Sequence, residues 1–501
     1  MVFRKGAFMR KKVFRFLVSA TISFSLLASQ ATAGVWVNDI HSQANKTLVD
    51  EIIQPSSIDD IRTAISKAKS EGKAVSISGG RHAMGGQQFG TGTILLDMSK
   101  MNRVLSFDVE KGLITVEAGI QWPELVNNLL DRQKDHWPQW GIRQKQTGAD
   151  RLSIGGALSA NVHGRGLSMK PFIDDVESFT LIDASGKQLF CSRTENSALF
   201  DLVIGGYGLF GVISSATLRL SRRTKIERVV EVIPISDLIA KVEQRKKDGF
   251  LFGDFQYVID PKSDDFLARG VFSCYKPVDD ARPMPAVQKE LSNKNWDELY
   301  YLAHVDKKQA FERYSSYYLS TSGQLYWSDI HQMSIYNDNY HEALDKKLGT
   351  TEKGNEWITE IYVPRSSLVS FMKDAADQIR KNQSNVIYGT IRFIEKDDES
   401  FLAWAREPFA CIIFNLHFTQ SDAGIDTVAQ QLRDLIDIAI KYHGGYYLTY
   451  HHFATRAQVD ACYPQFSRFL QLKLKYDPEE RFQSNWYRHY KKMFGVGSAD
   501  K

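Results

Sequence analysis

The stretch that most constrains the fold is residues 75–86, which read VSISGGRHAMGG. Its first four residues are short and β-prone, which is typical of a strand buried on both faces. Glycines follow at positions 79, 80, 85 and 86, with Arg81 and His82 between them. Glycine lets a backbone approach a ligand closely, and a guanidinium beside free N–H groups suits an anion such as a pyrophosphate. The stretch predicts a nucleotide-binding loop or, taken alone, a glycine-rich turn with a surface histidine.

Two further stretches are rich in small residues. Residues 147–166 read TGADRLSIGGALSANVHGRG and end near His163, and residues 204–220 read IGGYGLFGVISSATLRL. The second contains the spacing GxGxxG at Gly206, Gly208 and Gly211. A Rossmann fold needs a helix after such glycines, whereas a β-rich run follows here. We therefore expect no Rossmann fold, and a loop that closes on the adenine end of a nucleotide.

Length, charge and cysteine content bound the remaining possibilities. A chain of 501 residues predicts two domains. The formal net charge is only +4 and no long basic run follows the N-terminus, so no nucleic-acid partner is expected. The four cysteines are far apart and fit no metal-binding spacing. We expect four buried free thiols and no metal site, although an oxidising compartment would permit a disulfide.

The N-terminus has the three-part pattern of a secretory signal. Basic residues up to Arg15 precede an apolar run at residues 16–28, and Ala31-Thr32-Ala33 offers a cleavage site. The apolar run is short for a membrane span, so no stable membrane insertion is expected. The pattern predicts a signal peptide over residues 1–33 and a periplasmic or secreted protein, with an uncleaved anchor as the alternative.

Local patterns predict the elements of both halves. Ser57 is expected to cap a helix with one apolar face, and residues 175–183 and 187–191 to form a hairpin. From about residue 224 glycine becomes sparse and the pattern indicates an antiparallel sheet with helices on one side. We expect strands at residues 252–259, 357–363, 386–395 and 410–418 and helices near residues 366–381 and 425–441. The predicted domains are residues 34–223 and 224–445, with a tail, residues 446–495, that returns to the first domain.

The order of the three small-residue stretches resembles the vanillyl-alcohol-oxidase family of flavoproteins, which have an FAD-binding domain of the p-cresol-methylhydroxylase (PCMH) type. In that family the histidine of a G-x-H-S-x-x-G loop carries FAD covalently. His82 takes that place here, and Ala83 stands where serine is usual. The family's S-x-x-G-x-x-x-x-x-x-HG pattern is similar to residues 153–164, and its G-x-x-G-V-I element matches residues 208–213.

This resemblance implies an α+β fold with a two-part FAD-binding domain and a substrate domain whose antiparallel sheet is covered by helices. It implies FAD as the cofactor, held through a single link at His82, because residues 148–151 lack the cysteine of doubly linked members. The cofactor-binding residues that it implies are Ser78, Gly79, Gly80, Arg81, His82, Ala83, Gly148, Ser153, Gly156, Ala160, Asn161, His163 and Ile213.

The C-terminal half resembles sugar-lactone and polyol oxidases and the decaprenylphosphoryl-ribose oxidase. Residues 390–393, TIRF, are similar to a strand that aims an arginine at the flavin, here Arg392. Relatives place a lysine on a tail strand, and His451 falls at about that position. The resemblance implies that Arg392 stabilises the reduced flavin or holds a hydroxyl, that His451 or His417 is the base, and that His163 lines the site. Each histidine could instead be a hydrogen-bonded structural residue.

These features together predict an exported FAD-dependent oxidoreductase that oxidises an alcohol group of a sugar, polyol or lactone-like small molecule by hydride transfer. Oxygen and another electron carrier both stay open as the acceptor. One alternative is a flavin enzyme for an aromatic alcohol or amine, since Tyr317, Tyr318, Tyr326, Trp327 and Trp404 enrich the second domain. Another is a non-catalytic binding protein that retains the fold.

Overall fold

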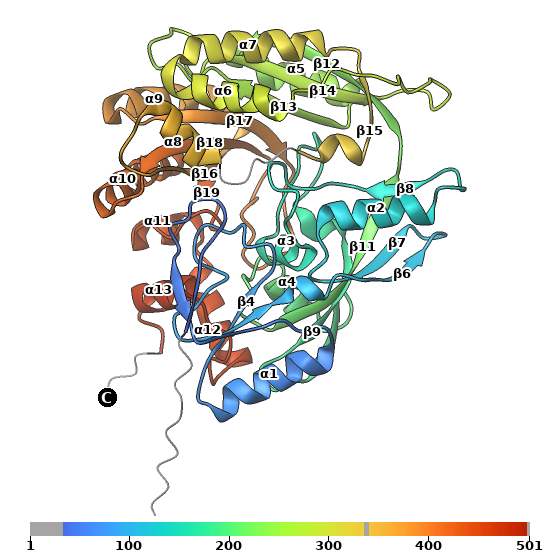
Figure 1. Ribbon diagram of the computed structural model, residues 1–501, viewed down its shortest axis with the longest axis vertical. Coiled ribbons are helices and arrows are strands. Elements are labelled where there is room, and N and C mark those ends of the chain that lie inside the picture. Colours follow the sequence, from blue (N-terminus) through green and yellow to red (C-terminus); the bar gives the residue numbers. More distant parts are fainter. Residues whose placement is uncertain (1–33, 335–339, 498–501) are drawn as a thin grey trace, which may run out of the picture. The chain divides into compact units, whose positions relative to one another are not determined.

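The computed structural model describes residues 34–334 and 340–497. From Gly34 onward the chain forms one compact unit (Figure 1). The predicted signal peptide, residues 1–33, lies outside the described residues. Among the helices of the two described ranges, none is both long and apolar enough to cross a membrane.

The first glycine stretch follows a strand of a small parallel sheet. Its strands pair in the order β3 (Glu51–Ile53), β5 (Ile94–Asp97) and β4 (Val75–Ser78). Helix α1 (Ile58–Ser70) covers this sheet (Figure 1), and the hydroxyl of Ser57 accepts a hydrogen bond from the backbone N–H of Asp60, so the predicted cap is confirmed. A separate two-stranded ribbon consists of β1 (Val35–Val37) and β2 (Thr47–Val49).

A second, antiparallel sheet carries the other two small-residue stretches. Its order is β10-β9-β11-β7-β6, and β8 pairs with the end of β11. The strands are β6 (Val104–Asp108), β7 (Leu113–Glu117), β8 (Trp140–Ile142), β9 (Val176–Ile182), β10 (Gln188–Ser192) and β11 (Val212–Arg222). The helices here are α2 (Trp122–Arg132), α3 (Ile154–Ala160) and α4 (Ser197–Val203), with 3-10 turns η1 (Met98–Lys100) and η2 (Phe172–Asp175). β9 and β10 form the predicted hairpin, and β11 follows the GxGxxG glycines directly, so the exclusion of a Rossmann fold is confirmed.

An eight-stranded sheet occupies most of the second half, and all its pairings are antiparallel. Its order is β15-β12-β14-β13-β17-β18-β16-β19. The strands are β12 (Lys225–Pro234), β13 (Phe252–Tyr257), β14 (Arg269–Pro277), β15 (Leu325–Trp327), β16 (Gly354–Pro364), β17 (Val386–Ile394), β18 (Phe409–Thr419) and β19 (Gly445–Tyr446). The sheet and its helices confirm the α+β class.

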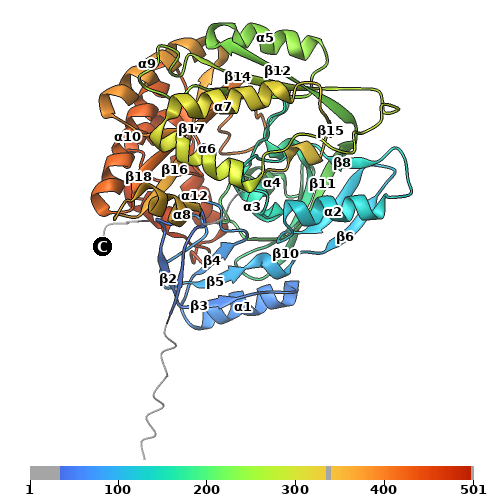
Figure 2. The same ribbon diagram turned by 45° about the horizontal axis from the view of Figure 1, so that its top comes forward.

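Helices lie on both faces of this sheet, so the prediction of helices on one side was wrong. Arg228 and Glu231 of β12 point to opposite faces because they are three residues apart in a regular strand. Glu231 pairs with Lys241 of α5, whereas Arg228 lies over the ring of Tyr318 of α7. Figure 2 shows α6 and α7 running across the sheet. The elements are α5 (Ile235–Lys247), α6 (Asn293–Val305), α7 (Lys307–Ser320), α8 (Tyr340–Leu348), α9 (Leu368–Asn382) and α10 (Asp422–Lys441), with turns η3 (Ile330–Gln332) and η4 (Arg365–Ser367).

The tail contains no strand at His451, contrary to the expectation. β19 ends at Tyr446, and residues 447–455 are irregular before α11 begins. The side-chain amide of Gln87 donates to the carbonyls of Leu448 and Thr449, which a neighbouring strand would otherwise engage. Farther on, Phe482 bridges to Val75 of β4. The tail helices are α11 (Arg456–Cys462), α12 (Phe466–Tyr476) and α13 (Asn485–Phe494).

The four cysteines, Cys191, Cys274, Cys411 and Cys462, are all buried and unpaired, as predicted.

Candidate functional site

A single large cavity joins the three small-residue stretches to the eight-stranded sheet. Its volume is about 1350 Å³, counting the part open to solvent. The loop after β4, helix α3 and the turn before β11 form one side, and residues of β16, β17 and the tail form the other. Of the predicted cofactor-binding residues, all but Asn161 line it. The cavity thus brings together segments that lie far apart in the sequence.

The loop after β4 passes so close to a neighbouring segment that only glycine fits. A Cβ atom on Gly80 would lie 2.2 Å from the backbone oxygen of Arg151, and one on Gly79 would lie 2.0 Å from the hydroxyl of Ser153. Arg81 itself takes a positive φ of 58°. The glycines therefore hold this loop against the start of α3, and the cavity lies between them.

His82 projects from that loop into a buried position beside a second histidine. Its Nδ1 atom lies 2.9 Å from Nε2 of His41, a residue that sequence reasoning missed. Burial, aided by the nearby charge of His41, lowers the pKa of His82 well below its usual value. The His82 side chain is therefore a neutral imidazole at neutral pH.

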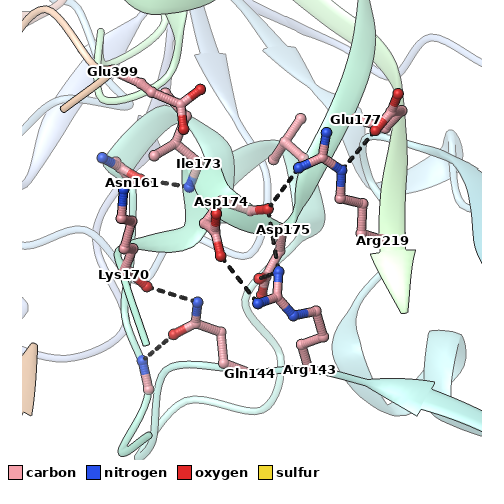
Figure 3. Close-up of polar contacts among 12 residues, drawn as sticks. Arg143, Gln144, Asn161, Lys170, Ile173, Asp174, Asp175, Glu177, Arg219 and Glu399 are labelled. Atoms are coloured by element: carbon pink, nitrogen blue, oxygen red, sulfur yellow. Dashed lines mark hydrogen bonds and ion pairs between the residues drawn. The ribbon is translucent and has the colours of Figure 1, made fainter. Parts of the chain in front are cut away.

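Helix α3 places its small residues along the cavity floor. Ser153 caps the helix by accepting from the backbone N–H of Gly156, and both residues line the cavity. Asn161 ends the helix in the left-handed region and points away from the cavity. Its Oδ1 accepts from the backbone N–H of Ile173 (Figure 3). Its Nδ2 donates to Asp397. Asn161 thus positions η2 and is not among the residues that line the cavity.

The opposite wall carries a buried histidine–glutamate pair. Nε2 of His163 lies 2.5 Å from Oε1 of Glu360 on β16, and Nδ1 of His163 lies 3.0 Å from the carbonyl oxygen of Gly164. Both ring nitrogens of His163 therefore face oxygen acceptors, which fixes the orientation of the ring. Sequence reasoning missed Glu360. The available signal was its position in a predicted strand, because side chains two residues apart in a strand point to the same face, and one face of β16 lines the cavity.

Arg392 lies on β17 and lines the same wall. Its side chain is buried, and its Nε atom has no hydrogen-bond partner among the described residues. A guanidinium N–H without a partner in a buried wall is available to an anionic group in the cavity.

The other two predicted catalytic histidines do not line the cavity. His451 is fully buried between the rings of Tyr446 and Phe453, and its Nε2 lies 3.2 Å from the hydroxyl of Thr359. Burial lowers the pKa of His451 to about 3. His417 lies instead beside Glu356, farther along the sheet. The structure therefore does not bring these two residues together with Arg392 and His163.

Comparisons with known proteins match both halves of the chain. The FAD binding domain family matches residues 49–192, and the D-arabinono-1,4-lactone oxidase family matches residues 291–490. The first match covers the loop of His82 and helix α3, and the second covers β16, β17 and the tail. The chain belongs to the PCMH-type FAD-dependent oxidoreductase family.

Relatives of this PCMH-type protein include lactone-oxidising enzymes. An uncharacterized oxidoreductase of the fasciation locus of Rhodococcoides fascians is 34% identical over 170 residues, which is 34% of this chain and 37% of the relative. L-Gulonolactone oxidase of Bos taurus is 28% identical over 200 residues, 40% of this chain and 43% of the relative. The chain thus spans about two fifths of these two relatives. L-Gulono-1,4-lactone dehydrogenase of Mycobacterium tuberculosis is 23% identical over 442 residues, 87% of this chain and 95% of that protein.

FAD is the cofactor of this PCMH-type protein, and the cavity fits it. Several buried polar atoms in the lining lack hydrogen-bond partners among the described residues, including Ser78 Oγ, His82 Nε2 and Thr147 Oγ1. Such atoms normally find a ligand or water. The close glycine loop leaves backbone N–H groups free to face a pyrophosphate. The residues present therefore suit a long nucleotide cofactor with a small substrate beside it.

Proposed function

We propose that the protein oxidises a CH–OH group of a sugar-lactone-like substrate with its FAD. The observation that carries this proposal is one cavity in which the glycine loop of His82 faces Arg392 and the His163–Glu360 pair. The loop of His82 and helix α3 would hold FAD, which would supply acceptance of the hydride from the alcohol carbon and transfer of two electrons to oxygen or another carrier. The hydroxyl proton goes to the protein.

The chain's own residues supply the proton acceptor and the positive charge. The carboxylate of Glu360 accepts the hydroxyl proton, and the imidazole of His163 holds this carboxylate in place. The positive charge of Arg392 stabilises negative charge that develops on the group facing it, and its burial in the cavity wall strengthens this attraction. These roles replace those expected for His451 and His417.

A sugar-lactone substrate is supported by the relatives named lactone oxidases and dehydrogenases and by the match over residues 291–490. The aromatic alternative has less support, because Tyr317, Tyr318, Tyr326, Trp327 and Trp404 are all absent from the cavity lining.

Anaerobic mixing with a substrate panel tests this function. Purified holoprotein is mixed with aldonolactones, free sugars, polyols, aromatic alcohols and amines, and the loss of the flavin's visible absorbance is followed. Bleaching by a lactone or sugar alcohol supports the proposal. Bleaching only by aromatic alcohols or amines, or by no compound, contradicts it, and the second result favours a non-catalytic binding protein.

We further propose that FAD is bonded covalently to His82. A neutral imidazole inside the cavity is the form that can act as a nucleophile. A ring nitrogen of His82 would hold the flavin and would lose its proton as the nitrogen–carbon bond forms; the bonded carbon would lose one proton, and the two electrons left on the flavin would pass to the acceptor. In wild-type protein, acid precipitation should leave the yellow colour with the chain and add the mass of FAD. His82→Ala should release all flavin under acid, and a wild-type chain of unmodified mass would contradict the link.

The segment before Gly34 supports a third proposal, that the protein is exported and its signal is cleaved near Ala33. A covalently held cofactor would suit a periplasmic or secreted enzyme, since a dissociated FAD would be lost by dilution. N-terminal sequencing of protein from the periplasmic and external fractions of the native host checks this. An intact N-terminus on protein found only inside the cell would contradict export.

A further inference from the structure

A second group of chemically active side chains lies outside the cavity, at the end of the large sheet near α6 and α8. It consists of Glu356 on β16, His417 on β18, His304 on α6 and His341 on α8. Figures 1 and 2 both show α8 beside β16 and β18. In the pairing of β16 with β18, Glu356 lies directly opposite His417. The ring of His304 packs edge-on against that of His417, with 4.7 Å between the ring centroids.

Three atoms of this group face one another without hydrogen bonds. Oε1 of Glu356 lies 3.9 Å from Nε2 of His304 and 3.8 Å from Nδ1 of His417. The side chains of His304 and Glu356 are only 5% and 6% exposed, so water cannot readily satisfy them. None of the three atoms has a hydrogen-bond partner among the described residues. Buried polar atoms left unpaired in this way need a ligand.

The other carboxylate oxygen is already held in place. Oε2 of Glu356 lies 2.9 Å from Nε2 of His341 and accepts a hydrogen bond from the hydroxyl of Tyr340. These contacts fix the carboxylate so that Oε1 points at the two remaining imidazoles. Outer groups that orient a carboxylate in this manner are a regular feature of metal sites.

The spacing of the three facing atoms suits a small divalent cation. They all lie within 4.8 Å of one another. In a tetrahedral zinc site with bonds of about 2.0–2.2 Å, neighbouring ligand atoms are about 3.3–3.6 Å apart. The two distances from Oε1, 3.9 and 3.8 Å, exceed this spacing by a few tenths of an ångström, and the two imidazole nitrogens are at most 4.8 Å apart, so small side-chain rotations would bring the set together. Two imidazoles with one carboxylate favour zinc or a similar transition metal over magnesium or calcium, which prefer oxygen ligands.

We propose that His304, Glu356 and His417 bind a divalent transition-metal ion, with zinc as the best match. The three ligands leave a fourth position for water. This departs from the expectation of no metal site, which rested on cysteine spacing; here the ligands come from one helix and two strands and share no local motif. The proposal does not depend on the proposed reaction.

The ion would lie just outside the cavity, beyond the residues that line it. Glu356 and Glu360 share one face of β16 and are four residues apart, which is about 13 Å along a strand. Ile358, between them on the same face, also lines the cavity, whereas Glu356 does not. The ion's place is therefore where α6 and the sheet meet, and it joins these elements.

Metal content of the purified holoenzyme tests the site. After treatment with a chelator and its removal, the protein is titrated with Zn²⁺ by calorimetry, and bound metal is counted by mass spectrometry. We expect one equivalent of zinc and a higher melting temperature on adding it back. His304→Ala and Glu356→Gln should each bind zinc at least 100-fold more weakly, and His341→Ala about 10–100-fold more weakly. His136→Ala, at an exposed position, is the matched control and should bind as wild type does.

Retention of the flavin spectrum and of the far-ultraviolet circular dichroism shows that each variant is folded. Co²⁺ provides an independent readout on wild-type protein, because tetrahedral cobalt absorbs at longer wavelengths than flavin. No bound equivalent of either metal in the wild-type protein would overturn the proposal. So would an equivalent that persists unchanged in folded His304→Ala and Glu356→Gln proteins.

Discussion

Nε2 of His163 lies 2.5 Å from Oε1 of Glu360, and both side chains are almost fully buried beside the cavity. The two residues are separated by 197 positions in the sequence. The fold creates their contact by setting the end of α3 against β16. In the proposed function this pair provides the proton acceptor, in place of a lysine on the tail.

Replacing Glu360 with glutamine should therefore slow the reaction strongly. The amide cannot accept the hydroxyl proton, so we expect flavin reduction to slow by about 10²–10⁴-fold, the usual range for loss of a general base. Stopped-flow flavin bleaching measures this rate, and an unchanged flavin spectrum confirms the fold. Glu312→Gln, on the exposed face of α7, is the control. A rate in Glu360→Gln within a factor of three of the wild-type value would remove Glu360 from the mechanism.

Arg392 should matter through its charge. Arg392→Met removes a buried positive charge from the cavity wall, so reduced flavin is less stabilised and its midpoint potential should fall. We expect flavin reduction to slow by about 10²–10³-fold, as for the loss of an electrostatic stabiliser. Arg392→Lys should recover part of the potential but less of the rate, since an ammonium lacks the guanidinium's fixed geometry. Spectroelectrochemical titration checks the potential, with the exposed Arg468→Met as the control. Equal potentials in all three variants would rule out this role.

Local sequence predicted the parts of this molecule that local physics determines. The cap at Ser57, the β9–β10 hairpin and the strand after Gly211 each depend on a few neighbouring residues, and all were confirmed. The small residues of α3 could also be assigned to the cavity from the sequence, because a large ligand can approach the backbone closely only where side chains are small.

Contacts made across the chain could not be predicted. The tail was expected to continue as a strand, but Gln87, more than 360 positions away, takes the carbonyls of residues 448 and 449 and leaves His451 packed behind the wall. Glu360 carries no motif and gains its meaning only from the position of His163. Similarly, local sequence does not determine which face of the large sheet each helix covers. Contacts between distant residues do, such as that of Glu231 with α5 on one face and that of Arg228 with α7 on the other.

The glycine loop makes a steric prediction. In Gly80→Ala the new methyl group would lie 2.2 Å from the backbone oxygen of Arg151, and backbone cannot move aside cheaply. Overpacking of this kind costs about 1–3 kcal/mol, and here it displaces the loop that carries His82. We expect lower flavin content and a lower melting temperature. Gly445→Ala is the matched control, because the nearest atom to its new methyl group would be 3.7 Å away. Full flavin loading in Gly80→Ala would contradict the close approach.

Asp175 predicts how stability depends on pH. Its carboxylate is 2% exposed and lies 2.8 Å from Nη1 of Arg143 (Figure 3), yet neither carboxylate oxygen has a hydrogen bond of good geometry among the described residues. Burial outweighs the attraction of Arg143 and raises the pKa of Asp175 to about 7. In the unfolded chain an aspartate has a pKa of about 3.9.

Between these two pKa values the folded state holds a proton that the unfolded state has lost. Asp175 therefore lowers the free energy of unfolding as pH rises from about 4 to about 7, by up to about 1.4 kcal/mol per pH unit, and contributes no further change above that range. Asp175→Asn keeps the shape and removes the titration, so its unfolding midpoint in urea should vary less with pH over this window. The exposed Asp377→Asn should follow the wild-type curve. Parallel curves for Asp175→Asn and wild type would mean that the native carboxyl is already ionised below this window, with Arg143 compensating fully for its burial.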